Sequence, residues 1–194
     1  MSGPERFQLH ESGAWLGRFD PIEIDLLRLA STQLVDMLDA GTADPDGAAS
    51  DGVFGRLLPA AYRDDDEAAA EFRRFTAPGL LERKAQNARI VLNSLGTDSS
   101  DSTDSSDSSD SPDPADEAAD PDEEGREPVT VRLDAEAVQA WLRSLTDLRL
   151  TLADRLQISP DGVVHLTGTN AAFLRELYEW LGMLQEELVY AIDV

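Results

Sequence analysis

The hydrophobic positions of this chain repeat with the period of an α-helix over several stretches, most clearly from Pro21 to Ala40. Asp20 is a favourable N-cap residue, Pro is preferred at the first helical position, and Glu23 completes a capping box. Gly41 then ends the stretch, because glycine is a common helix C-terminal residue. The pattern therefore predicts a well-delimited helix near the N-terminus.

Two more helices are predicted near the C-terminus. Asp134 can cap the first, whose apolar positions form one arc: Val138, Trp141, Leu145, Leu148, Leu152 and Leu156. The second begins at Thr169 or Asn170, and its leucines alternate in steps of three and four: Leu174, Leu177, Leu181, Leu184 and Leu188. This spacing resembles a coiled-coil seam. It is shorter than the roughly three or four heptads that a coiled coil requires, so packing in the core of the same chain is favoured.

Short segments rich in apolar and β-branched residues predict a small antiparallel β element. Phe7–Leu9 and Ala14–Phe19 flank the turn residues Ser12-Gly13, and Val129–Leu133 alternates apolar and polar side chains. Val163–Leu166 is a further candidate strand.

The region after the first helix is interrupted by loop signals. Residues 42–52 are rich in Gly, Asp and Ala and predict a loop, whereas residues 53–58 predict a short helix. The sequence Thr76-Ala-Pro-Gly79 separates two further predicted helices, over residues 65–75 and 78–95.

Residues 97–127 differ from the rest of the chain. Asp recurs at every third position from Asp98 to Asp116, and the segment carries 13 acidic residues and one Arg. It has little to bury and its charges repel one another, so we expect it to be disordered. The predicted fold class is mainly α: a bundle of five to six helices with a small antiparallel β element, in one domain over residues 1–194 that the disordered acidic insert interrupts.

Two residues of the predicted helix after Asp134 break its pattern. Arg149 falls within the apolar arc, and Leu150 falls on the polar side. An Arg at such a position either extends its guanidinium to solvent or forms a buried ion pair. Glu23 lies in the apolar arc of the first helix and is the candidate partner, so we hypothesise a structural Glu23–Arg149 ion pair. Leu150 indicates a second contact, with another helix or another chain.

Charge and composition exclude several classes of protein. The formal net charge of −23 argues against attraction to nucleic acids or anionic membranes, and a chain without Cys has no disulfide or thiol switch. The first residues lack the regions of a signal peptide, and no apolar run approaches the roughly 20 residues of a membrane span. We therefore expect a cytoplasmic protein that does not enter the membrane.

No pattern in the sequence predicts catalysis, a metal or a cofactor. The two His residues stand alone, and the acidic loop after Gly41 has Gly55 where a calcium-binding EF-hand needs Glu. Phosphate-binding glycine motifs do not occur. The single Lys, Lys84, is interpreted as a surface residue whose stem packs on an apolar face. We expect a protein that is not an enzyme.

One local signal indicates binding. Residues 71–95 carry five basic residues against two acidic ones: Arg73, Arg74, Arg83, Lys84 and Arg89. This basic stretch predicts an anion-facing surface for an acidic protein or for DNA. The alternative is that these cations pair with the acids of the same chain. Five cations are few for DNA binding, so direct contact with DNA has weak support.

Four blocks of sequence resemble a known family. They are FDPIEIDLLRLASTQLVDML (19–38), RLLPAAYRDDDEAAAEFRRFTAPGLLERKAQNARIVLNSL (56–95), WLRSLTDLRLTLADRL (141–156) and LYEWLGMLQEELV (177–189). Together they resemble the actinobacterial AosR-like family, which is named after an oxidative-stress transcription regulator and was earlier catalogued as a domain of unknown function. The resemblance covers nearly the whole chain outside the Asp/Ser insert.

The resemblance implies a regulatory protein and supplies no catalytic residue. Members of the family are typically encoded beside the adaptor ClpS, and the regulator that gives the family its name resembles a redox sensor with a cysteine pair and a sigma factor as partner. This chain has no Cys, so thiol sensing does not carry over. We expect a regulator that contacts the transcription machinery, either a sigma factor or RNA polymerase. The alternative is an interaction module in ClpS-linked proteolysis.

Overall fold

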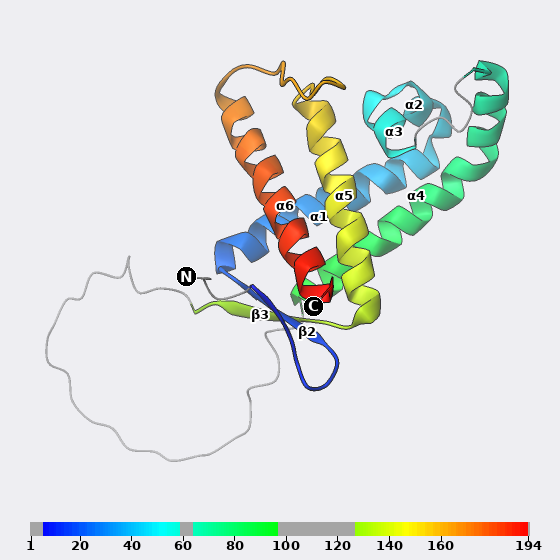
Figure 1. Ribbon diagram of the computed structural model, residues 1–194. Helices are drawn as coiled ribbons and strands as arrows, with labels where there is room; N and C mark the ends of the chain where they lie inside the picture. The colour runs from blue at the N-terminus through cyan, green and yellow to red at the C-terminus, as the bar shows by residue number, and fades with distance from the viewer. Residues whose placement is uncertain (1–5, 59–63, 97–126, 194) are drawn as a thin grey trace, which may run out of the picture.

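A computed structural model of the protein describes residues 6–58, 64–96 and 127–193 (Figure 1). The described part is mainly helical with a three-stranded antiparallel sheet, as the sequence predicts. The insert expected at 97–127 lies, except for Glu127, outside the described residues. The elements in chain order are β1 (Phe7–Leu9), β2 (Trp15–Phe19), α1 (Pro21–Ala43), α2 (Pro45–Ser50), α3 (Gly52–Leu57), α4 (Asp66–Gly96), β3 (Val129–Leu133), α5 (Ala135–Arg155) and α6 (Thr169–Asp193).

The sheet has the order β1-β2-β3, with Phe7 opposite Gly17 and Trp15 opposite Leu133. The predicted hairpin turn is confirmed, and Gly13 adopts a positive φ of 79° there, which glycine tolerates without steric cost. The strand predicted at 163–166 is wrong. That segment forms one isolated β-bridge, between Ile158 and Val164. The turn at residues 159–162 brings only this pair of residues together, and the chain then continues to α6.

Helix α5 is the most enclosed helix of the described fold, and Figure 1 shows it between α6 and α4. It contacts α1, α3, α4, α6 and β3. Trp141 is completely buried, packs against Phe19 with ring centroids 5.7 Å apart, and donates its indole N–H to Ser94 on α4. Leu150 is half-buried against the same core, so its predicted second contact lies within this chain.

The leucines of α6 that the sequence assigned to core packing are in the core. Leu181, Leu184 and Leu188 are buried against the other helices, and Leu174 and Leu177 pack beside them. None of the described helices combines the length and the apolar character needed to cross a membrane.

Two predictions in the middle of the chain are wrong. The expected loop at 42–52 begins inside α1, which runs past the predicted end at Gly41 to Ala43, where its C-cap is Asp44. It also contains α2, because Pro45 occupies the first turn of that helix and Asp44 accepts a hydrogen bond from the amide of Gly47. The two helices expected on either side of Thr76-Ala-Pro-Gly79 are one helix, α4, with Pro78 inside it. Proline removes one backbone hydrogen bond, but the burial of Leu81 and of the alanines that follow holds the helix in place beyond it.

Candidate partner-binding site

Glu23 forms a different ion pair from the one that the sequence predicted. Its carboxylate accepts hydrogen bonds from Arg6 Nη1 at 2.7 Å, from the Asp20 amide at 2.9 Å and from Trp180 Nε1 at 3.1 Å. Burial by itself would raise the pKa of Glu23, but these hydrogen bonds and the charge of Arg6 hold the pKa below its ordinary value. Glu23 therefore joins the N-terminal segment, α1 and α6.

Arg149 does not contact Glu23, which corrects the predicted pair. Its guanidinium packs on α6, where Nη1 donates to Gln185 Oε1 at 3.0 Å and Cζ lies 5.0 Å from the centroid of the Tyr178 ring. The group lies against Gly182, where a Cβ would stand 3.4 Å from Cζ, an ordinary van der Waals contact. The physical reason for the error is the side of α6 that each residue meets: Glu23 binds Trp180, whereas Arg149 binds Tyr178 and Gln185 on the other side of that helix.

The five cations of the basic stretch do not form one surface. Arg89 pairs with Asp39 of α1 at 2.6 Å, and Lys84 pairs with Asp147 of α5 at 2.6 Å. For these two residues, the structure agrees with the alternative that the basic side chains pair with acidic residues of the same chain. Arg83 donates to the backbone carbonyl of Gly79 on its own helix. Arg73 and Arg74 lie elsewhere, at an apolar pocket.

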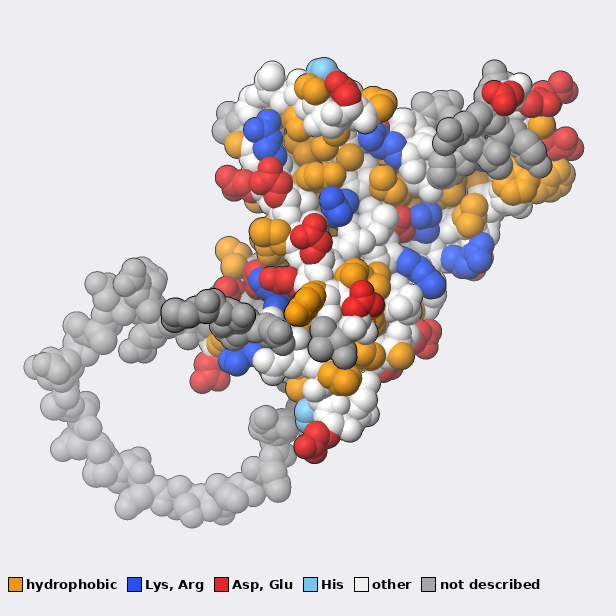
Figure 2. All heavy atoms as spheres, in the orientation of Figure 1, with side chains coloured by type: hydrophobic (Ala, Val, Ile, Leu, Met, Phe, Trp, Pro, Cys, Tyr) orange, Lys and Arg blue, Asp and Glu red, His pale blue; other side chains and the backbone are white. Residues whose placement is uncertain are grey.

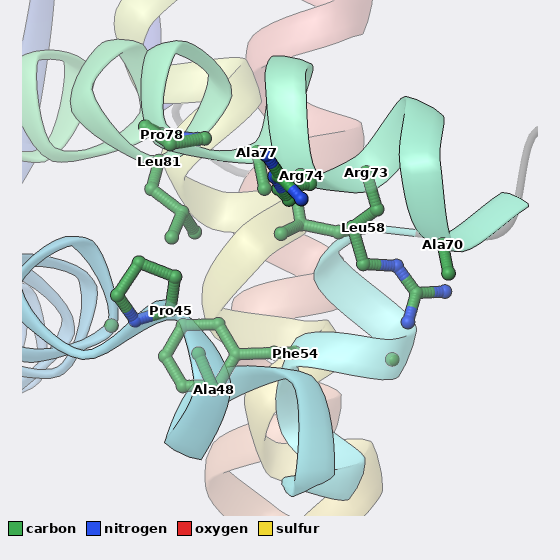
Figure 3. A pocket seen from close by; sticks show the side chains of 12 residues that line it. Pro45, Ala48, Phe54, Leu58, Ala70, Arg73, Arg74, Ala77, Pro78 and Leu81 are labelled. Atoms are coloured by element: carbon green, nitrogen blue, oxygen red, sulfur yellow. The ribbon is translucent and has the colours of Figure 1, made fainter.

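This pocket, which we call the Arg73/Arg74 pocket, lies between the C-terminal end of α1, α2, α3 and the first half of α4 (Figure 3). Its volume is about 280 Å³. Its lining residues are Gly41, Pro45, Ala48, Phe54, Gly55, Leu58, Ala70, Arg73, Arg74, Ala77, Pro78 and Leu81. In Figure 3, Phe54 and Pro45 lie on the wall opposite α4, and the side chain of Arg73 extends from α4 toward α3.

The shape of this pocket depends on a close contact between α1 and the Phe54 ring and on the capping of α3. A Cβ on Gly41 would overlap the tip of the Phe54 ring, so the ring can approach α1 this closely because residue 41 is glycine. Asp51 caps α3 by accepting a hydrogen bond from the amide of Val53 at 2.9 Å. The cap fixes the start of the helix that carries Phe54.

The two arginines of the pocket differ in exposure: Arg74 is exposed and Arg73 is half-buried. Neither Arg73 nor Arg74 forms an ion pair with an acidic side chain in the described part of the chain. The guanidinium of Arg74 lies over the ring of Phe75, which is 70% exposed. Figure 2 shows Lys and Arg side chains over the middle of α4 and Asp and Glu side chains at its outer end. Arginine and aromatic residues are enriched at the energetic centres of protein interfaces.

The sequence interpretation missed the partner of Lys84. Asp147 is only 3% exposed, and its pKa is raised by burial although the hydrogen bond and charge of Lys84 act in the opposite direction. A signal was present in the sequence. Ser144, Asp147 and Thr151 recur at intervals of three and four, and all are buried on α5.

The amino-acid sequence matches, over residues 4–192, the family described as a domain of unknown function, DUF2017. The chain therefore belongs to this family. It is also similar to proteins from Mycobacterium bovis and Mycobacterium tuberculosis that are named oxidative stress regulator AosR, with 28% identity over 156 residues. These matches confirm the AosR-like resemblance.

Each of these alignments covers 73% of this chain and 58% of its relative, so the match spans less than two thirds of the length of these relatives. No solved structure matches the chain.

Proposed function

We propose that this protein is a stress regulator that acts through protein contacts with the transcription machinery and without thiol redox chemistry. The observation that carries the proposal is the Arg73/Arg74 pocket, where two arginines without acidic partners in the described residues border an apolar cavity. The name of the mycobacterial relatives, oxidative stress regulator, supports the regulatory role. The lack of Cys directs the mechanism toward binding.

The chemistry of the pocket favours an acidic protein segment with an apolar side chain. The cavity would take the apolar side chain, and the guanidinium groups would bind flanking carboxylates, which Arg contacts with two parallel hydrogen bonds. The net charge of −23 does not prevent this contact, because salt screens charges beyond about 8 Å at physiological ionic strength. DNA fits less well, since binding to it requires many phosphate contacts.

The partner on this proposal is RNA polymerase or a sigma factor, and the protein would act in the cytoplasm as one regulatory domain, residues 1–194, around the acidic insert. The test is affinity purification of the full chain from its native host, followed by mass spectrometry. The wild-type chain should retain polymerase or a sigma factor. The charge-reversed double variant Arg73→Glu/Arg74→Glu should lose it.

A matched control reverses two exposed charges elsewhere, in Arg18→Glu/Arg175→Glu, and should retain the partner. Reproducible absence of both polymerase and sigma factors from the wild-type sample would overturn the proposal. Recovery of the Clp adaptor or protease in their place would support the ClpS-linked role instead.

A further inference from the structure

A second groove lies among α4, α5 and α6, and it is separate from the Arg73/Arg74 pocket. We call it the Lys84 groove. Its volume is about 590 Å³, and its lining residues are Leu80, Arg83, Lys84, Asn87, Leu142, Arg143, Thr146, Asp147, Gln185 and Val189. Small-molecule sites commonly have volumes of about 300–1,000 Å³. The groove falls within this range, whereas the Arg73/Arg74 pocket, at about 280 Å³, falls just below it.

The groove has an excess of positive charge. Arg83, Lys84 and Arg143 line it, and the single acidic residue among its lining residues is Asp147, so the lining carries a net charge of +2. In the described part of the chain, neither Arg83 nor Arg143 is paired with a carboxylate. In a chain with a net charge of −23, this excess of cations is a local exception.

Two polar groups of the groove, those of Lys84 and Gln185, are held in place by other side chains. The buried carboxylate of Asp147 accepts one hydrogen bond from the Lys84 ammonium at 2.6 Å, and an ammonium can donate two more. Gln185 donates to Thr146 Oγ1 at 2.8 Å and accepts from Arg149, so the α6 wall is fixed as well. Groups that are already ordered lose less conformational entropy when a ligand binds.

We infer that the Lys84 groove binds a small organic anion that presents carboxylate or phosphate oxygens. Arg83 and Lys84 line the groove from α4 and Arg143 lines it from α5, and guanidinium groups bind both kinds of oxygen with paired hydrogen bonds. Leu80, Leu142 and Val189 supply an apolar border for the carbon part of the ligand. Such a site would allow this protein, which has no cysteines, to respond to a small ligand.

The test is isothermal titration calorimetry of the full chain with two probes in separate arms, citrate and inorganic phosphate. Wild type should bind at least one probe saturably at one site. Arg143→Gln should weaken binding about tenfold, because it removes a charge-assisted hydrogen bond. Arg83→Gln should weaken it as well. Arg175→Gln removes the same charge from an exposed position outside the groove and should leave the affinity unchanged.

Tighter binding of citrate would assign the groove to carboxylates, and tighter binding of phosphate would assign it to phosphoryl groups. Equal weakening by Arg143→Gln and Arg175→Gln would overturn the inference, because it would indicate general charge attraction. The inference would also fail if a polyglutamate peptide bound and neither small anion did. Since Arg73 and Arg74 lie outside the groove, these results are independent of the partner proposal.

Discussion

Lys84 on α4 donates a hydrogen bond to Asp147 on α5 across 2.6 Å, and the carboxylate is almost completely shielded from water. The two partners are unequally exposed, since the Lys84 side chain is 23% exposed and the Asp147 side chain 4%. Removing either charge therefore leaves the other in a different environment. An unpaired lysine here can extend toward solvent, whereas an unpaired carboxylate stays buried.

This asymmetry predicts unequal effects of two substitutions on the free energy of unfolding. Lys84→Met should lower it by about 3 kcal/mol at neutral pH, because it leaves a buried charge without a partner. Asp147→Asn should change it by about 1 kcal/mol or less, because burial already disfavours the charged carboxylate. Chemical denaturation of both variants measures the difference. Equal losses would contradict the account.

Acidification should diminish the defect of Lys84→Met. Asp147 has a raised pKa in the folded protein, so the folded state binds a proton more readily than the unfolded state does. The free energy of unfolding therefore rises as the pH falls from the pKa of Asp147 in the folded protein toward its lower pKa in the unfolded chain. Denaturation curves of Lys84→Met and wild type should converge on acidification, and a gap that widens would be inconsistent with a buried carboxylate.

Glu23 should show the opposite dependence on pH. Its pKa is lowered in the folded protein, so the stability that it contributes is present above the unfolded pKa and is lost as the pH falls through the folded pKa. Glu23→Gln should cost about 2 kcal/mol near neutrality, because it weakens hydrogen bonds to a charged group. The cost should shrink under acid. A cost that is independent of pH would show that the charge of Glu23 is not what stabilises the contact.

A double-mutant cycle tests the corrected placement of Glu23 and Arg149. In the structure the two residues share no interaction partner, since Glu23 binds Arg6 and Trp180 and Arg149 binds Gln185 and Tyr178. The stability losses of Glu23→Ala and Arg149→Ala should therefore add to within about 0.5 kcal/mol. A larger coupling energy would restore the ion pair that the sequence first indicated.

Two glycines of the Arg73/Arg74 pocket offer a matched pair. Gly41→Ala should lower the free energy of unfolding by about 1–3 kcal/mol, because the new methyl group would overlap the ring of Phe54. Gly55→Ala meets no atom within 4 Å, and it should raise stability by about 0.5–1 kcal/mol through the helix propensity of alanine. Thermal denaturation of both variants would show the difference in sign, and a Gly41→Ala protein as stable as wild type would contradict the close contact with Phe54.

Local signals in the sequence were sufficient for much of the fold. The Asp20-Pro21 start of α1, the hairpin around Gly13 and the strand at 129–133 depend on nearby residues, so a single sequence predicts them. Pro78 was misleading for the same reason. Its local tendency to end a helix is overridden by the burial of Leu81, which depends on residues far away in the chain.

The pairing of charged side chains could not be predicted in the same way. Arg149 lies on a buried side of its helix, as the periodicity indicated, but the identity of its neighbour depends on how α5 and α6 pack. Glu23 contacts Arg6 only because β2 runs back along β1 and brings the start of α1 beside Arg6. The composition of residues 71–95 was enough to find the basic stretch. Three-dimensional packing decides that Arg89 pairs with Asp39, that Lys84 pairs with Asp147 and that the other arginines include two at the Arg73/Arg74 pocket.

Site-specific photocrosslinking in the native host tests the central claim most directly. A photoreactive phenylalanine analogue would replace Phe75, which is 70% exposed beside Arg74, and in a separate control Phe173, which is 54% exposed on α6. The account predicts a covalent adduct with a subunit of RNA polymerase or with a sigma factor from position 75 and none from position 173. Adducts from position 173 alone, or none from position 75 with either partner, would contradict it.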